Sequence, residues 1–254
     1  MSETHENLVT RQFGPRATAY LTSAVHAGGE DLRQLAAMVE GARTARLLDL
    51  GCGAGHVAFA VAPAVTEVIA YDLSEDMLAA VAAAAAARGL GNVATRQGAA
   101  ERLPFADASF DIVLSRFSAH HWHGFAAALA EARRVLAPGG RAAFVDVVAP
   151  ESPVCDSFLQ AVELLRDTSH VRDYSPAEWH RALVAAGFSP GGTTPRRLRL
   201  DFASWVERMR TPALHVEAIR SLQAAMAAEV ADHFAIEADG SFTIDTLTML
   251  ATPA

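Results

Sequence analysis

The sequence predicts an α/β protein with a doubly wound, mostly parallel sheet of seven strands and helical additions at the N-terminus and after the fifth strand. Short apolar segments alternate with segments of helical periodicity between residues 47 and 148. Strands this apolar indicate a sheet that helices cover on both faces. We expect a single domain over residues 1–254, with a core at about 40–150 and substrate-side additions at about 1–40 and 151–235.

The predicted elements follow one another along the chain. Strands are expected at residues 47–50, 68–71, 92–95, 110–115, 142–148, 198–202 and 242–249. Helices are expected before residue 40, at 57–61, after the Ser74 cap, and at 122–136, 154–166, 176–186 and 205–234. Pro138, Gly139 and Gly140 should end the helix over 122–136, and Pro212 should break the last helical stretch.

The composition excludes several classes of protein. The chain has 254 residues and a net charge of -8, and its 21 basic residues are all arginine. An acidic chain lacks the clustered cations of a nucleic-acid surface, and without lysine it has no Schiff-base or P-loop lysine. Only Cys52 and Cys155 are present, and no apolar run is long enough to span a membrane. We therefore expect a cytoplasmic protein without nucleic-acid or membrane partners.

The most informative segment is a glycine turn at residues 51–55, directly after the first strand. Because glycine has no Cβ atom, a flat ligand can approach this backbone closely, and Asp72 at the end of the second strand can accept both hydroxyls of a ribose. A dinucleotide would need a third glycine where His56 stands, and Asp49 would repel its pyrophosphate. The Asp49 carboxylate instead suits the sulfonium and ammonium groups of S-adenosylmethionine.

Four segments together resemble the class I S-adenosylmethionine-dependent methyltransferases, in the branch that includes the methyltransferases of ubiquinone and menaquinone biosynthesis. They are LLDLGCGAGHVA (47–58), YDLSEDML (71–78), GAAERLPFADASFDIVLSR (98–116) and EARRVLAPGG (131–140). The resemblance implies a Rossmann-like methyltransferase fold with S-adenosylmethionine as cofactor. It also implies methyl transfer to a small-molecule metabolite, at an oxygen, nitrogen or carbon atom.

The resemblance further implies a set of cofactor contacts. The residues expected to contact the cofactor are Tyr20, Asp49, Gly51, Cys52, Gly53, Asp72, Leu73, Met77, Ala99, Ala100, Glu101, Ser115 and Arg116. Within this set, Asp72 would bind the ribose, while Leu73 and Met77 would enclose the adenine. Many members carry an acid at the position of Ala99, so a backbone contact must take its place here.

His120 and His121 are the candidate catalytic residues, as general bases. They follow the fourth strand, in a loop that borders the ligand crevice of a doubly wound sheet. Methyl transfer is an in-line displacement in which the protein mainly aligns the nucleophile, and a base helps only when the nucleophile begins protonated. Alternatively, one histidine caps the next helix and the other packs beside Trp122. Together with His123 they match no zinc spacing, so no metal is expected.

Other interpretations of the sequence stay open. The chain could be an NAD-dependent oxidoreductase on a similar sheet, against which His56 counts, or a cofactor-binding subunit without activity. Arg172 could hold an acidic substrate group or pair with Asp167 or Asp173 at the surface. A stripe of apolar residues could roof the substrate pocket or belong to the core, namely Phe202, Trp205, Met209 and Leu214.

Overall fold

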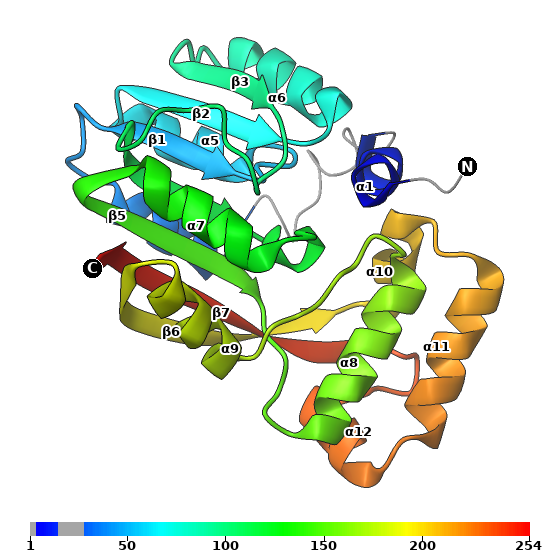
Figure 1. Cartoon of the computed structure of the whole chain (residues 1–254). Coiled ribbons are helices and arrows are strands. Elements are labelled where there is room, and N and C mark those ends of the chain that lie inside the picture. The colour runs from blue at the N-terminus through cyan, green and yellow to red at the C-terminus, as the bar shows by residue number, and fades with distance from the viewer. Residues whose placement is uncertain (1–3, 15–27) are drawn as a thin grey trace.

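A computed structural model describes residues 4–14 and 28–254, and a seven-stranded sheet forms its centre (Figure 1). The strands are β1 (Arg46–Leu50), β2 (Glu67–Asp72), β3 (Val93–Gln97), β4 (Phe110–Arg116), β5 (Leu136–Val147), β6 (Phe188–Leu200) and β7 (Phe242–Pro253). Their order across the sheet is β3-β2-β1-β4-β5-β7-β6. The first five strands are parallel, and β7 runs antiparallel to both of its neighbours. The predicted doubly wound, mostly parallel sheet is therefore confirmed.

Helices cover both faces of the sheet. On one face lie α4 (Glu30–Met38), α5 (His56–Val61), the 3-10 turn η2 (Ala62–Ala64) and α6 (Glu75–Ala87). On the other face lie α7 (Phe125–Val135) and α9 (Pro176–Ala185). Neighbouring strand residues point to opposite faces, so that Leu47 packs in one core and Leu48 in the other. This two-sided burial explains why the strands are apolar throughout.

A helical lobe extends from one end of the sheet (Figure 1). It consists of α8 (Pro153–Arg166), α10 (Phe202–Met209), α11 (Ala213–Ala225) and α12 (Ala228–Phe234), and it shares a core with the nearby ends of β6 and β7. Phe202 and Trp205 belong to that core and Met209 is also buried, whereas Leu214 is 73% exposed. Three of the four residues of the predicted apolar stripe are thus buried in the protein interior, and Leu214 belongs neither to the core nor to the lining of the cavity. Across residues 4–14 and 28–254, no helix is both long enough and apolar enough to cross a membrane.

The helix predicted at 122–136 is shorter than expected. A 3-10 turn, η3 (Ala119–His121), comes first, and α7 begins only at Phe125. Two hydrogen bonds hold the residues just before α7 in a non-helical conformation. The Nε1 atom of Trp122 donates to the Ser118 hydroxyl (3.1 Å), and the backbone N–H of Gly124 donates to the Glu101 carboxylate (2.9 Å).

Two strands begin several residues earlier in the structure than the sequence predicts, and both contain proline and glycine. β5 begins at Leu136 and includes the Pro-Gly-Gly run, because Leu136 pairs with Phe110 before the register shifts. β6 begins at Phe188, whereas the sequence predicts a strand only at 198–202. β6 lies at the edge of the sheet, where proline is tolerated, and its register with β7 shifts between Pro190 and Thr193. The stretch 205–234 contains parts of three helices and not one or two.

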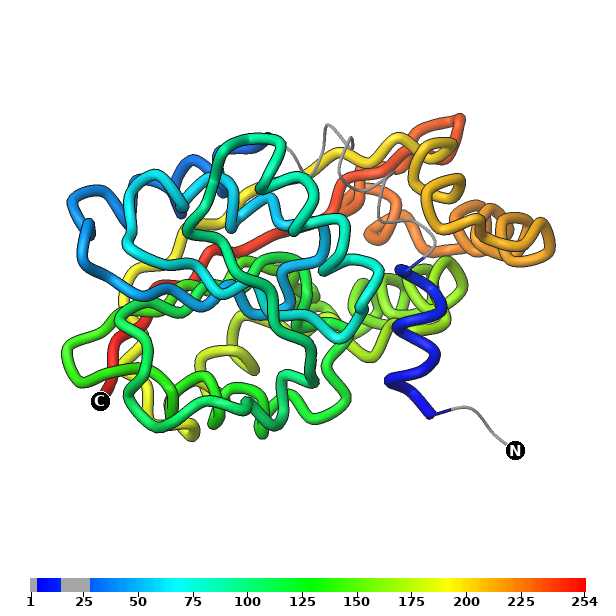
Figure 2. The backbone as a smooth tube through the Cα atoms, turned by 90° about the horizontal axis from the view of Figure 1, so that it is seen from above, coloured from blue at the N-terminus to red at the C-terminus, as the bar shows by residue number. Residues whose placement is uncertain are grey.

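Helix α1 (His5–Phe13) stands apart from these layers. Both views place it at the end of the sheet opposite the C-terminus (Figures 1 and 2). Because the C-terminus ends the antiparallel strand β7, α1 lies at the carboxyl ends of the parallel strands. In doubly wound sheets this is the edge where ligands bind.

Candidate active site

A cavity of about 570 Å³ lies where β1, β2 and β4 end, with α1 beside it. Most of the predicted cofactor residues line it: Asp49, Gly51, Cys52, Gly53, Asp72, Leu73, Met77, Ala99, Ala100, Glu101 and Arg116. From α1 it is lined by His5, Glu6, Val9 and Phe13. None of the described lining residues comes from 151–235, the segment predicted to contact the substrate.

Among the described residues, two predicted site residues are not part of this lining. Ser115 is expected to contact the cofactor. In the structure it is buried inside the sheet, where it pairs with Phe144 of β5, and it does not line the cavity. His120 also lies outside the lining, whereas its neighbour His121 is part of it. Tyr20 falls outside the described residues.

The glycine turn and Asp72 are joined by a hydrogen bond. The backbone N–H of Gly53 donates to Oδ2 of Asp72 (2.8 Å), and the N–H of Ser74 donates to Oδ1 (2.9 Å). Gly51 has a φ of +69°, and a Cβ atom there would collide with the hydroxyl of Ser118. At Gly53, by contrast, a Cβ would meet no atom of the described residues within 4 Å, so none of them fills the space on this side of the turn.

Asp49 is buried at the base of the cavity. Its Oδ2 atom accepts a hydrogen bond from the N–H of Ala58 (2.9 Å) in the first turn of α5. Its Oδ1 atom has no hydrogen-bond partner within the described part of the chain. Burial raises the pKa of Asp49 to about 7, and the nearby Asp72 adds to the effect. The carboxylate therefore occupies the helix end where dinucleotide-binding folds hold a pyrophosphate, and it leaves one oxygen for a cation.

The wall formed by residues 98–101 is held by polar contacts within the chain. The Tyr71 hydroxyl donates to the carbonyl of Ala99 (3.1 Å), and burial raises the pKa of Tyr71 to about 12, so that it remains a donor. The Glu101 carboxylate is engaged by the N–H of Gly124. This wall therefore presents backbone groups and small side chains to the cavity.

Arg116 lines the cavity, but its guanidinium is paired with an acid that the sequence did not indicate. Its Nε atom donates to Oδ2 of Asp31 in α4 (2.5 Å), and both side chains are almost completely buried. The guanidinium also lies over the ring of Phe117, 4.7 Å from its centroid. The ion pair ties the end of β4 to α4, a contact between residues 85 positions apart.

His121 presents a neutral imidazole at the cavity. Its Nδ1 atom lies 3.1 Å from the carbonyl of Ser169. Because a carbonyl only accepts hydrogen bonds, Nδ1 carries the proton and Nε2 is free to accept one. Burial, together with the positive charge of His120, lowers the pKa of His121 to about 4.

Asp167 lies beside the His121 ring. Its Oδ1 atom accepts hydrogen bonds from the N–H and hydroxyl of Ser169 (2.9 and 2.6 Å) and from Nε2 of Gln12 in α1 (3.2 Å). Its buried Oδ2 atom has no hydrogen-bond partner within the described residues and lies 4.0 Å from Nε2 of His121. In the sequence, Asp167 stands out only as a possible partner of Arg172. That arginine pairs instead with Asp156 and Glu178.

Helix α1 contacts His121 directly. The ring of Phe13 packs edge-on against the His121 ring, with 4.9 Å between centroids, and Nε2 of His5 donates to the His121 carbonyl (3.1 Å). In the described part of the chain, no group of three histidine, cysteine, aspartate or glutamate residues could hold a metal ion.

Comparison with known proteins identifies the family of this cavity-bearing fold. A family described as "Methyltransferase domain" matches residues 48–144. The uncharacterized protein YafE of Escherichia coli is 50% identical over 204 residues, which cover 80% of this chain and 99% of YafE. The uncharacterized methyltransferase YcgJ of Bacillus subtilis is 40% identical over 201 residues, which cover 79% of each chain.

Structural similarity agrees with this result. The crystal structure of YcgJ has a TM-score of 0.84 and 35% identity, and the match covers 87% of this chain and 97% of YcgJ. In sequence, the chain is also similar to the demethylmenaquinone methyltransferase of Chlorobaculum parvum, with 37% identity over 117 residues, which cover 46% of each chain. The chain therefore belongs to the class I S-adenosylmethionine-dependent methyltransferases, and it is an enzyme of that class.

Proposed function

We propose that the enzyme transfers the methyl group of S-adenosylmethionine to a small-molecule acceptor in the cytoplasm, and that His121 is the general base. The observation that carries the proposal is that a single cavity is lined both by the glycine turn with Asp49 and Asp72 and by His121. The cysteines Cys52 and Cys155 are free thiols, in keeping with a reducing compartment.

The residues at the turn fit S-adenosylmethionine, which supplies an activated methyl group on a sulfonium. Asp49 has a buried oxygen without a hydrogen-bond partner among the described residues, which suits an ammonium group, and the side of Gly53 that faces away from them leaves room beside the backbone. The Asp72 carboxylate accepts backbone hydrogen bonds from Gly53, Leu73 and Ser74, and because a carboxylate has about four lone-pair sites, an acceptor site is left for the ribose. Leu73 and Met77 would enclose the adenine.

His121 has the geometry of a base that is ready at neutral pH. Its Nε2 atom would take the acceptor's proton as the acceptor's lone pair forms the new bond to the methyl carbon, while the carbon–sulfur bond of the sulfonium breaks and its electron pair stays on sulfur as a neutral thioether. Oδ2 of Asp167, 4.0 Å away, would then stabilise the imidazolium. A base of lowered pKa holds protons weakly, so the matching acceptor has a weakly held proton of its own. We therefore propose a phenol or an enol in preference to an alcohol.

The size and charge of the site support a small acceptor. A cavity of about 570 Å³ is within the range of sites for small molecules, and α1 covers it. The net charge of -8 disfavours nucleic acid. One relative, which matches 46% of this chain, is named as a methyltransferase of demethylmenaquinone, which is not a nucleic acid.

A screen of acceptors tests the proposal. Phenols, enols, alcohols, amines and nucleic acid would each be incubated with the enzyme and isotopically labelled cofactor, and methylated products would be detected by mass. We expect product with phenolic or enolic compounds and little with alcohols. Methylation of alcohols at the same rate would contradict the proposed acceptor class, and methylation of nucleic acid alone would contradict a small-molecule acceptor.

A further inference from the structure

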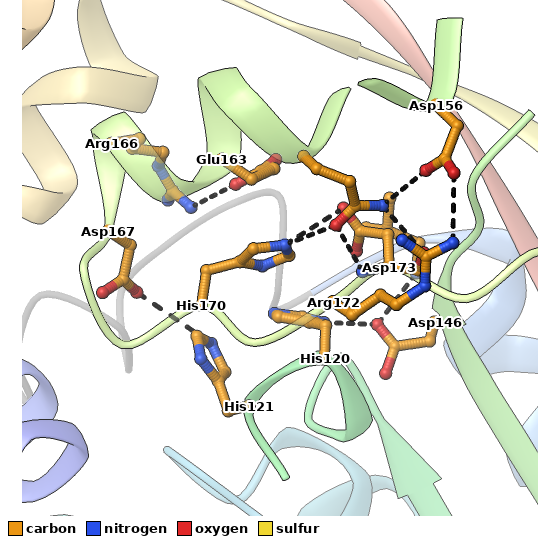
Figure 3. A network of polar contacts seen from close by, with 12 residues as sticks. His120, His121, Asp146, Asp156, Glu163, Arg166, Asp167, His170, Arg172 and Asp173 are labelled. Atoms are coloured by element: carbon orange, nitrogen blue, oxygen red, sulfur yellow. Dashed lines mark hydrogen bonds and ion pairs between the residues drawn. The ribbon is translucent and has the colours of Figure 1, made fainter. Parts of the chain in front are cut away.

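A buried polar cluster lies behind His121 and outside the cavity. It comprises His120, Asp146, Glu163, His170 and Asp173, which come from η3, from β5, from α8 and from the loop after α8. Figure 3 shows the rings of His120 and His121 beside one another, with contacts that run to different acids, Asp146 and Asp167. None of the five residues lines the cavity, so none of them acts on the substrate directly.

Asp146 holds the turn that carries His121. Its Oδ1 atom accepts hydrogen bonds from Nδ1 of His120 (2.5 Å) and from the N–H of Val147 (2.8 Å). Its Oδ2 atom accepts one from the N–H of Ala119 (2.8 Å). From the other side, the N–H of Val171 donates to the carbonyl of His120 (2.8 Å). The short η3 turn is thus fastened to β5 and to the loop after α8 immediately before His121.

The same contacts make His120 a cation. Burial alone would lower the pKa of His120, but the charge and hydrogen bond of Asp146 outweigh it and raise that pKa to about 9. The centroids of the His120 and His121 rings are 4.3 Å apart. A protonated His120 therefore opposes a second proton on His121.

The groups that face His121 come from four elements. His120 in η3 opposes its protonation, while Asp167 after α8 and Asp146 in β5 favour it. From α1, Phe13 contacts the ring and His5 contacts the carbonyl. The carbonyl of Ser169 accepts a hydrogen bond from the Nδ1–H group of His121. Burial and His120 prevail over the two acids, which is why the pKa of His121 is lowered.

We infer that His120 and Asp146 form a positioning pair, which fixes the turn that carries His121 and places a positive charge beside its ring so that Nε2 stays free to accept a proton. The inference rests on the proposed role of His121 as a base. It assigns a function to an ion pair that is expensive to bury, since taking two charges out of water costs free energy that their mutual attraction does not always repay. The charge of His120 affects His170 as well. The centroids of these two rings are 5.9 Å apart, and burial and the charge of His120 lower the pKa of His170.

Histidine titration by NMR tests the pair without any acceptor. The full chain would be labelled at histidine Cε1 and titrated as the wild type and as His120→Gln, in which glutamine still donates to Asp146 but carries no charge. We expect the midpoint of His121 to rise by about one pH unit or more in His120→Gln. In Asp146→Asn, the midpoint of His120 should fall by at least about one unit. His180→Gln, which removes an exposed histidine on α9, should change neither midpoint.

The outcomes separate this inference from the proposed function. An unchanged His121 midpoint in a folded His120→Gln variant overturns the positioning pair. If the variants do not fold, the wild type decides, because a neutral His120 at pH 7 overturns it as well. Once an acceptor is found, the acid limb of the pH profile of kcat/KM should move upward in His120→Gln as the His121 midpoint does. A His121→Gln variant with the wild-type rate would instead contradict the proposed base, whatever the NMR midpoints.

Discussion

The backbone N–H of Gly53 donates a 2.8 Å hydrogen bond to the carboxylate of Asp72. This contact joins the turn after β1 to the end of β2. The acid proposed to bind the ribose therefore also shapes the glycine turn proposed to bind the same cofactor. The register of β1 and β2 explains the contact, because Leu50 and Tyr71 are paired and both chains leave the sheet together. The two motifs therefore act as one unit.

Replacement of Asp72 by asparagine should weaken cofactor binding. The asparagine side chain would keep one acceptor oxygen but lose the charge and one hydrogen bond to the ribose, so we expect the Kd for S-adenosylmethionine to rise at least about tenfold. Isothermal titration calorimetry measures the change. Glu75→Gln, an exposed acid one turn away in α6, is the matched control and should bind as the wild type does. Equal affinity of the Asp72→Asn variant would refute the ribose assignment.

Cofactor binding should depend on pH through Asp49. Because the pKa of Asp49 is about 7 in the free enzyme, the residue is partly protonated at neutral pH and must lose its proton to pair with an ammonium group. Affinity should therefore increase as the pH rises from about 6 to about 8, and protons should be released on binding. Calorimetry at about pH 6.5 in two buffers of different ionisation enthalpy measures the release. Asp49→Asn should bind more weakly and lose this slope, and a slope that persists in the variant would assign it to another group.

Loss of the imidazole at position 121 should affect turnover and not cofactor affinity. We expect His121→Gln to lower kcat by about 10²–10⁴-fold, the usual contribution of a general base, while the Kd for S-adenosylmethionine changes little. Asp167→Asn should lower kcat less, by about tenfold, because it removes the charge that stabilises the imidazolium but leaves the base itself in place. Steady-state kinetics with the acceptor found in the screen checks both variants, with His180→Gln as control. A wild-type kcat for His121→Gln would leave substrate alignment as the sole contribution of this loop.

Removal of the Arg116 guanidinium should destabilise the fold. Arg116→Gln leaves the buried carboxylate of Asp31 without its partner, and such a change costs about 3–5 kcal/mol in the free energy of unfolding. Urea denaturation measures the loss. Arg33→Gln in α4 removes an exposed arginine, 72% accessible, and should change the free energy of unfolding by less than about 0.5 kcal/mol. If Arg116→Gln were as stable as this control, the ion pair would have no structural role.

The double variant Arg116→Gln/Asp31→Asn supplies the second half of this test. It removes both charges, so no uncompensated carboxylate stays buried, and part of the stability should return. A double variant whose loss equals the sum of the two single losses would show that the two side chains act independently.

Several features of the fold follow from local sequence. The strands at β1, β2, β4 and β5 are apolar on both faces, and that pattern is visible in any short window of residues such as 47–50. The glycine turn and Asp72 were predictable for the same reason, because a positive φ at Gly51 and an acid at a strand end are requirements of single positions. β6 was mostly missed, since Pro190 and Pro195 oppose a strand locally and only its place at the sheet edge permits one.

The sequence by itself determined the alternation of strands and helices, the ligand-binding edge of the sheet and the loop that carries the histidines. Only the tertiary structure decided that His121 lines the cavity while His120 lies behind it, because neighbouring residues in a 3-10 turn point in different directions. It also decided which acids pair with which bases, as in Asp146 with His120 and Asp31 with Arg116. These partners are 26 and 85 residues apart, and side chains so distant meet only once the sheet has brought their elements together.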